Sequence, residues 1–470
     1  MARKKRDPFE GHSKPVTRRD FLGRGTLGFS ATVFAPTVLG SLLRSRQALA
    51  FAHGDDCSSR AATGFIPFLV FDCAGGAAMP GNFLVGGMGG PQDLLPAYDL
   101  LGWDPRAAGA LDTRFGLPMA AKASQILAGI LASASPAAQS GLKLGSLLHF
   151  AQDDTSTNSL SALILAIQAG ASGSVVNRGF GTQPSLSGGN SNAVAQDASF
   201  QPIIVQSIND VLNAISFGPA LDALSVASRR SIVQAALSMS LEQLGTLSGG
   251  NPGAFGKQMS CAFQSAIGYT TAGAAMDPRN DTVISGIYNI NAATDPADTN
   301  LISAAVVMNV LKGQSGPGVI TIGGCDYHDG TQATGDAKDL EIGTQIGRAV
   351  EAARALKTPL FFQVLTDGGL FAQSGTRNWG GDSGDKGMTV VGYYNPNSVP
   401  GLIHPSSPQI GAYNAGQGAD QSTLIGSDPG KAAYATLANY LQVCGKLAVN
   451  ADTFTGVFGT GMVDQVLLFS

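Results

Sequence analysis

Acidic residues stand at the ends of four apolar runs in this sequence. The runs cover residues 65–71, 144–150, 318–323 and 359–365, and the acidic residues that follow them are Asp72, Asp153 with Asp154, Asp326, and Asp367. Open α/β sheets place ligand sites at the carboxyl ends of their strands, so we expect these carboxylates to gather at one edge. A bound cation would relieve their mutual repulsion. Each aspartate could instead cap the helix or turn that follows it, and the sequence leaves both interpretations open.

The candidate ligands are mostly oxygen donors. We predict a metal site at Asp72, Asp326, His328 and Asp367, and a further candidate set consists of Asp153, Asp154, Asp382 and Asp385. Beyond residue 50 the histidines are His53, His149, His328 and His404, and only His328 lies among carboxylates. His149, near a strand end, is interpreted either as a core residue or as a ligand. Zinc usually takes several nitrogen or sulfur ligands, so we expect a hard divalent cation (Mg²⁺, Ca²⁺ or Mn²⁺) instead.

Strands and helices alternate at both ends of the chain. Besides the four apolar runs, further strands are expected at 173–177, 388–394 and 463–469, and helices at 119–133, 159–169, 228–247, 299–311, 336–356 and 429–447. This order predicts an α/β fold in which a mostly parallel sheet is flanked by helices. Residues 51–470 are expected to form a single domain with a largely helical insertion at about 185–315.

The segment 426–431, Gly-Ser-Asp-Pro-Gly-Lys, has the composition of a phosphate-binding loop. It is one residue too short for that loop, and Ala432 stands where a Ser or Thr would meet Mg²⁺. We therefore expect a turn in which Ser427 or Asp428 caps the helix that follows.

The first fifty residues have the pattern of an export signal. Arg18 and Arg19 precede an uncharged, mildly apolar stretch at 25–43, and Ala48-Leu49-Ala50 offers a small-x-small cleavage site near Ala50. The paired arginines indicate the twin-arginine translocase, which predicts that the protein folds first and then reaches the periplasm. A membrane anchor is the alternative, but Pro36 and the glycines suit a spanning helix poorly. No later segment is long and apolar enough to span, so we expect no stable membrane span in the mature chain.

Removal of this segment makes the chain more acidic. Residues 51–470 keep 19 basic and 30 acidic residues, so the formal net charge falls from −4 to −11. Such a surface repels phosphate backbones, and we expect no nucleic-acid partner. All five cysteines lie beyond residue 50, an odd number without C-x-x-C spacing. Because a protein that folds before export cannot depend on disulfides, we expect isolated, buried thiols.

Several of these segments resemble one known family in the same order along the chain. They are 17–22 (Thr-Arg-Arg-Asp-Phe-Leu), 71–76 (Phe-Asp-Cys-Ala-Gly-Gly), 153–158, 174–178, 323–328 (Gly-Gly-Cys-Asp-Tyr-His), 366–368 and 381–387. Together they resemble a family of bacterial proteins exported by the twin-arginine route and related to the sulfatase and alkaline-phosphatase superfamily. Some relatives carry a general-secretion-pathway label. The resemblance covers about 60–180 and 316–400, and it implies an alkaline-phosphatase-like fold with a metal site.

The chain departs from the superfamily pattern at two points. The superfamily's hydrolases usually bind two metals through several Asp and His ligands, whereas here Asp382, Ser383 and Asp385 stand where a later His is expected. No Ser, Thr or Cys is clearly a nucleophile, although Cys73 adjoins Asp72. Two functions follow as expectations. The first is a metal-dependent hydrolase of phosphate or sulfate esters, and the second is a non-catalytic binding or assembly protein of the cell envelope or secretion machinery.

Overall fold

The computed structural model describes most of the chain beyond residue 63. The described residues are 64–96, 103–152, 158–176, 178–182, 201–216, 219–247, 267, 273–325, 327, 332–366, 371–372, 379–380 and 386–470. The expected export signal lies outside them. Within these ranges, none of the helices combines the length and the apolar character that a membrane span requires.

The chain divides into two compact units. One comprises Met1–Cys57 and Ser216–Thr270, and the other comprises Ser58–Ile215 and Thr271–Ser470. The described part of the first unit holds α7 (Pro219–Asp222) and α8 (Val226–Leu247), and α8 confirms the helix expected at 228–247. The second unit holds the sheet. The segment expected as an insertion, about 185–315, contributes to both units.

An eight-stranded sheet is the centre of the second unit. In spatial order its strands are β12 (Gln409–Ile410), β4 (Leu142–His149), β11 (Gly387–Tyr394), β8 (Leu360–Thr366), β1 (Phe68–Cys73), β7 (Gly318–Thr321), β5 (Phe180–Gly181) and β6 (Ile203–Ile204). Strand β11 runs antiparallel to β4 and β8, and all other neighbours pair in parallel. The expected α/β class and the mostly parallel sheet are confirmed. The seven parallel strands therefore end at one edge, where β11 begins.

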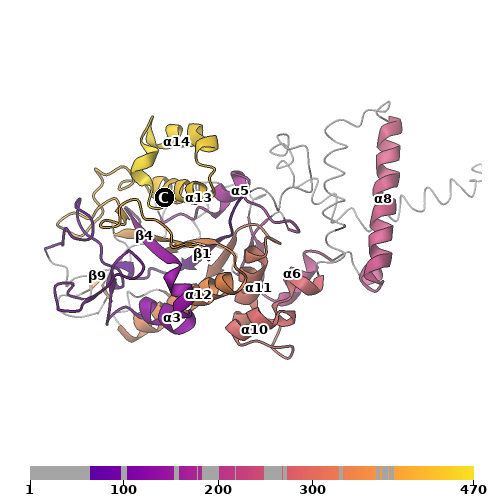
Figure 1. Ribbon diagram of the computed structural model, residues 1–470, viewed down its shortest axis with the longest axis horizontal. Coiled ribbons are helices and arrows are strands. Elements are labelled where there is room, and N and C mark those ends of the chain that lie inside the picture. Colours follow the sequence, from indigo (N-terminus) through magenta and orange to yellow (C-terminus); the bar gives the residue numbers. More distant parts are fainter. Residues whose placement is uncertain are drawn as a thin grey trace, which may run out of the picture. The chain divides into compact units, whose positions relative to one another are not determined.

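Helices cover both faces of this sheet, which gives three layers (Figure 1). On one face lie α3 (Gln125–Ser133), α11 (Thr299–Leu311) and α12 (Gln332–Ala355), and on the other lie α5 (Leu163–Gln168) and α13 (Pro429–Val443). The shorter helices are α4 (Pro136–Ser140), α6 (Ile208–Asn213), α10 (Thr282–Tyr288), α14 (Ala451–Phe458), η4 (Met79–Gly81), η8 (Pro278–Asn280) and η10 (Ala448–Asn450). Two small hairpins pair β2 (Leu111–Asp112) with β3 (Met119–Ala120) and β9 (Phe371–Ala372) with β10 (Trp379–Gly380).

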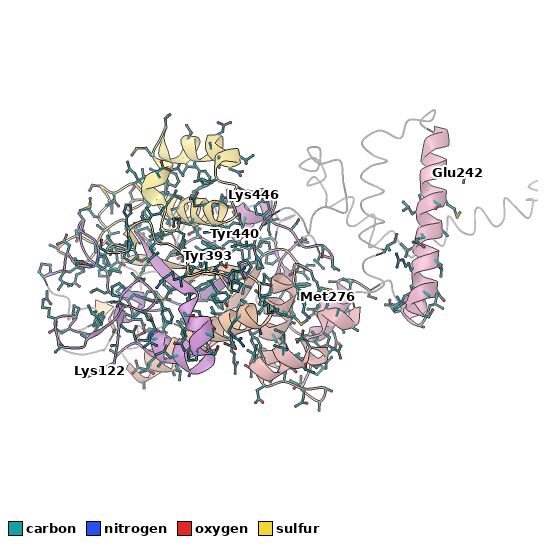
Figure 2. The ribbon with its side chains drawn as sticks, viewed as in Figure 1. Lys122, Glu242, Met276, Tyr393, Tyr440 and Lys446 are labelled. Carbon is teal, nitrogen blue, oxygen red and sulfur yellow. The ribbon has the colours of Figure 1, made fainter. Side chains whose placement is uncertain are left out.

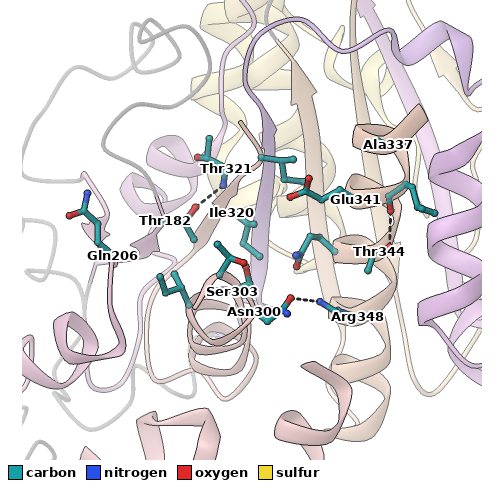
Figure 3. Close-up of a pocket in the computed structure, with 15 residues that line it drawn as sticks. Thr182, Gln206, Asn300, Ser303, Ile320, Thr321, Ala337, Glu341, Thr344 and Arg348 are labelled. Atoms are coloured by element: carbon teal, nitrogen blue, oxygen red, sulfur yellow. Dashed lines mark hydrogen bonds between the residues drawn. The ribbon is translucent and has the colours of Figure 1, made fainter. Parts of the chain in front are cut away.

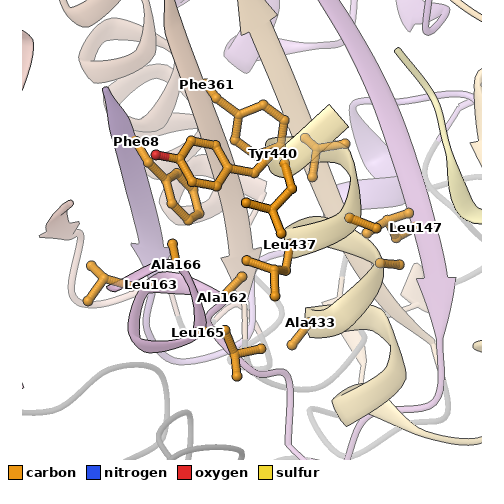
Figure 4. Packing of buried hydrophobic residues seen from close by; sticks show 14 of the residues in the cluster. Phe68, Leu147, Ala162, Leu163, Leu165, Ala166, Phe361, Ala433, Leu437 and Tyr440 are labelled. Atoms are coloured by element: carbon orange, nitrogen blue, oxygen red, sulfur yellow. The ribbon is translucent and has the colours of Figure 1, made fainter. Parts of the chain in front are cut away.

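Aromatic packing holds α13 to the sheet. Tyr440 of α13 (Figure 2) is fully buried and stacks on Phe68 of β1, with ring centroids 5.0 Å apart, and Phe361 of β8 packs beside it at 5.5 Å (Figure 4). The Tyr440 hydroxyl donates a hydrogen bond to the Ile66 carbonyl over 2.8 Å. Leu163 and Leu437 close the same cluster from α5 and α13 (Figure 4). Phe68 and Val70 of β1 thus pack against the α5 and α13 layer. The β1 residues between and directly after them point to the opposite face, toward α11 and α12.

Glycines allow α3 and α12 to approach each other closely. A Cβ at Gly343 of α12 would overlap the Ile126 carbonyl, and one at Gly129 of α3 would lie 2.5 Å from the Leu340 carbonyl. Backbone atoms cannot yield as a flexible side chain can. The two helices therefore need hydrogen, and not a methyl group, at these positions.

Three sequence-based expectations differ most from the structure. Residues 463–469 do not form a strand, because they make η11 (Val463–Val466) followed by a single bridge from Phe469 to Leu402. Residues 173–176 contribute only one bridge, from Val176 to Ser315. The helix expected at 119–133 begins later, at Gln125, where the Ser124 side chain accepts a hydrogen bond from Leu127 N.

Candidate functional site

Three neighbouring parallel strands bring their ends to the same level around Asp72. In the strand register, Asp72 of β1 pairs with Thr321 of β7 and with Leu365 of β8. Asp72 was expected to follow the strand, but it is the second-last strand residue, and its side chain is fully buried. One of its carboxylate oxygens, Oδ2, accepts a hydrogen bond from Thr321 Oγ1 over 3.4 Å. The sheet thus holds this carboxylate in a fixed place.

The other predicted ligands lie outside the described residues. They are Asp326, His328 and Asp367 of the first set and Asp153, Asp154, Asp382 and Asp385 of the second. Their described neighbours in the chain can be placed. Thr366, which precedes Asp367, pairs with Cys73, and Cys325, which precedes Asp326, donates its backbone N–H to the Ala74 carbonyl over 3.0 Å. These neighbours lie at the carboxyl edge, beside Asp72.

A glycine pair forms the turn that follows β1. Gly75 and Gly76 have φ values of 115° and 99°, in the region that favours glycine. The turn returns the chain toward β8, where Ala77 N donates a hydrogen bond to Thr366 Oγ1 over 2.6 Å. The two glycines therefore allow the chain to turn back across the edge of the sheet.

A buried polar network links α12 to this edge. Asp339 of α12 is fully buried, and its two carboxylate oxygens accept hydrogen bonds from Tyr327 Oη over 2.9 Å and from Asn82 Nδ2 over 2.8 Å. Asn82 Oδ1 in turn accepts one from the Ser124 hydroxyl over 2.8 Å. The network joins the N-terminal part of α12, Tyr327 after β7, Asn82 after η4 and the start of α3.

Asp339 is not among the residues predicted from the sequence, although its spacing offered a signal. It stands three residues before Ile342 and seven before Ile346, both of which are buried. Residues at that spacing share one face of a helix. An aspartate on the apolar stripe of an amphipathic helix is rarely buried without partners, and this one has them.

The Cys73 thiol lies beside the network and stays protonated. Burial raises the pKa of Cys73 well above its ordinary value, and a hydrogen bond with the Cys325 thiol and the nearby Asp72 carboxylate raise it further. Burial also raises the pKa of the Tyr327 phenol, as does Asp339. A nucleophilic cysteine needs its thiolate form. The surroundings of Cys73 therefore do not prepare it for covalent catalysis.

The cysteines and His149 behave as core residues where the structure describes them. Cys73, Cys325 and Cys444 are free thiols, whereas Cys57 and Cys261 lie outside the described residues. His149 is fully buried, with Nδ1 2.9 Å from the Phe150 carbonyl and Nε2 3.0 Å from Thr389 Oγ1. A carbonyl only accepts, so Nδ1 carries the proton and Nε2 accepts from Thr389. Burial lowers the pKa of His149 to about 4, so it is a neutral, satisfied core residue and not a ligand.

The segment 426–431 forms a helix cap. Asp428 is the N-cap of α13, and its carboxylate accepts a hydrogen bond from Gly430 N over 2.7 Å. The expected capping role is confirmed. The negative charge at this position also disfavours a bound phosphate.

In the described part of the chain, no group of three or more His, Cys, Asp and Glu side chains is arranged to hold a metal ion. Comparisons of the chain with protein-family models, curated proteins and solved structures found no match. What the protein does is therefore inferred from its own residues.

Proposed function

We propose that the protein is an exported hydrolase of phosphate or sulfate esters, with an alkaline-phosphatase-like fold and one hard divalent cation at the carboxyl edge of its sheet. The proposed ligands are Asp72, Asp326, His328 and Asp367. The observation that carries the proposal is the buried Asp72 carboxylate, held by strand register next to Thr366 and Cys325, the residues that precede Asp367 and Asp326 in the chain.

The Asp72 side chain is a suitable ligand for a hard cation. It offers carboxylate oxygens, which Mg²⁺, Ca²⁺ and Mn²⁺ prefer. Buried carboxylates are normally paired or bound to metals because desolvation of the charge is costly. The hydrogen bond from Thr321 measures 3.4 Å, which is longer than the roughly 2.5–3.0 Å of strong O–H···O bonds.

The chain's own groups have defined tasks in this proposal. Asp72 and the three ligands hold the cation, and Thr321 orients the Asp72 carboxylate. A bound divalent cation supplies two effects, a lower pKa for coordinated water and polarisation of the ester oxygen. Because burial keeps the Cys73 thiol protonated, we assign the attack to water and not to a covalent intermediate on this cysteine.

Metal content and thermal stability test the proposal together. We expect the purified protein to contain Mg, Ca or Mn and to lose stability in chelator. A site at 100 times its dissociation constant contributes about 2.7 kcal/mol, which gives a measurable melting shift. Asp326→Asn and His328→Ala should melt below wild type with metal and close to it in chelator. As a matched control, Asp428→Ala removes a helix cap and should cost about 1 kcal/mol in both conditions.

Hydrolysis of p-nitrophenyl phosphate and sulfate provides the second readout. A metal-free protein whose variants are equally destabilised with and without chelator would contradict the cation site. A metal-containing protein that hydrolyses neither ester would instead favour the alternative, a non-catalytic exported protein for binding or assembly.

A further inference from the structure

A pocket of about 560 Å³ opens between α11, α12 and the end of β7. Figure 3 shows Glu341 and Arg348 of α12 on one side and Asn300 and Ser303 of α11 on another. Thr321 lines the pocket and also donates a hydrogen bond to Asp72, so the pocket adjoins the candidate site. Its volume falls within the range of small-molecule sites, roughly 300–1,000 Å³.

The Arg348 guanidinium is the main charged feature of the pocket. It donates one hydrogen bond to Asn300 Oδ1 over 2.6 Å and lies over the Tyr288 ring, 5.5 Å from the ring centroid. These two contacts fix its position. Among the described residues it makes no ion pair, although the side chain is half-buried. A guanidinium carries five N–H donors in a planar fork that matches a carboxylate, and most of these donors remain for a ligand.

Hydrogen-bond acceptors lie next to the guanidinium. Gln345 is 8% exposed, and its Oε1 is buried with no hydrogen-bond donor in the described part of the chain. It stands three residues before Arg348, about 4.5 Å along the helix axis and on the same face. Glu341 lies one turn before Gln345 and carries a negative charge, paired at 2.9 Å with Lys338. The pocket therefore presents a cation beside a neutral acceptor and an anion.

Apolar side chains complete the wall. Four apolar residues line the pocket. They are Ile302 of α11, Ile320 of β7, Ile322 just after β7, and Leu340 of α12. They offer carbon surface to the part of a ligand that the polar groups do not contact. Ser303, 5% exposed and without a hydrogen bond from the described residues, adds one hydroxyl.

We propose that this pocket binds a free amino acid with an apolar side chain. The α-carboxylate would pair with Arg348, a rotation of the Gln345 side chain would bring its buried Oε1 to the α-ammonium near the Glu341 charge, and the side chain would pack on the isoleucines. A zwitterion satisfies the cation and the acceptors together, whereas a phosphate or sulfate would meet one guanidinium and face Glu341. The pocket does not depend on a cation at Asp72, so the inference stands apart from the proposed esterase activity.

Calorimetric titration of the full-length mature protein tests this binding. The probes are L-leucine, L-phenylalanine and L-tryptophan, with L-leucinamide lacking the carboxylate, 2-hydroxyisocaproate lacking the ammonium, and inorganic phosphate. We expect at least one amino acid to bind saturably below about 10 mM, and both leucine analogues to bind at least about tenfold more weakly than leucine. Saturable binding of none of the three amino acids, equal binding of leucinamide, or preferential binding of phosphate would overturn the proposal.

Two variants locate the binding in the pocket. Arg348→Met should weaken binding at least about tenfold, whereas Arg354→Met, on the same helix but outside the pocket, should leave it unchanged. The Glu side chain in Gln345→Glu has the same shape as the Gln that it replaces. This variant therefore tests the pocket even if Arg348→Met fails to fold. Its carboxylate should pair with Arg348, abolish amino-acid binding and preserve the melting temperature. Wild-type affinity in either Arg348→Met or Gln345→Glu would overturn the assignment.

Discussion

The Tyr327 hydroxyl donates a hydrogen bond to the Asp339 carboxylate over 2.9 Å, and both residues are fully buried. Through this bond the backbone that leaves β7 is fastened to α12. The carboxyl edge of the sheet therefore depends on a residue pair that belongs to neither candidate ligand set.

Replacement of Tyr327 by Phe should destabilise the protein by about 1–3 kcal/mol, because a buried carboxylate loses a donor. Equilibrium urea unfolding measures this change. Tyr393→Phe is the matched control, since the Tyr393 hydroxyl accepts only a 3.3 Å hydrogen bond from Asn395 in the described contacts. Its loss should cost less than half as much. Equal costs for the two variants would show that the Asp339 network does not stabilise the fold.

The buried His149 predicts a loss of stability in acid. Its folded pKa, about 4, lies below the ordinary value of 6.5, so the unfolded chain binds the proton first. The stability that this histidine confers is complete above about pH 6.5 and falls by about 1.4 kcal/mol per pH unit toward pH 4, about 3 kcal/mol in total.

Urea unfolding of wild type and His149→Gln between pH 8 and pH 4 isolates this contribution, because other titrating groups affect both proteins alike. The difference in unfolding free energy between them should shrink as the pH falls. A constant difference across that range would contradict the neutral, buried state of His149.

Close packing of α3 and α12 predicts opposite effects for two glycine substitutions. Gly343→Ala places a methyl group against the Ile126 carbonyl and should destabilise the protein by about 1–3 kcal/mol. Gly286→Ala, in α10, meets nothing within 4 Å and should stabilise it by about 0.4–1 kcal/mol. Thermal melts of both variants give the comparison. Stabilisation by both would mean that the two helices can separate without cost.

The proposed export signal predicts an export defect when its arginine pair changes. Arg18 and Arg19 replaced together by Lys should leave precursor in the cytoplasm, because Lys lacks the planar guanidinium fork. Cell fractionation with immunodetection measures the distribution. Normal amounts of mature protein in the periplasm would indicate another route. A mature N-terminus far from Phe51 would separately contradict cleavage after Ala50.

The apolar runs that form β1, β4, β7, β8 and β11 could be predicted from the sequence, whereas the run 463–469 could not. Helix Thr299–Leu311 has the bounds that its pattern predicts, since a capping aspartate at 298 precedes a continuous apolar stretch. The run 463–469 is apolar in the same way but short, and packing against the α13 layer decides its conformation. Hydrophobic periodicity alone cannot tell whether such a run forms a strand or a short helix.

The candidate site could be predicted only in part. Register confirms that Asp72 lies at the carboxyl edge, and the metal-binding roles of Asp72 and of the seven other predicted ligands stay predictions. Asp339 and Arg348 were missed for a physical reason. Their roles depend on contacts between segments that are distant in sequence, such as Asn82 with Asp339 and Asn300 with Arg348.

The reversed direction of β11 has a consequence for how the protein can diverge. Because β8 ends and β11 begins at the same edge, the connection 367–386 has both of its ends anchored there, and no register in the sheet depends on its length. Doubling the length of a loop costs only about 0.6 kcal/mol in closure entropy. Insertions and deletions beyond Asp367 in this connection can therefore accumulate over evolutionary time while β8 and β11 keep their pairing.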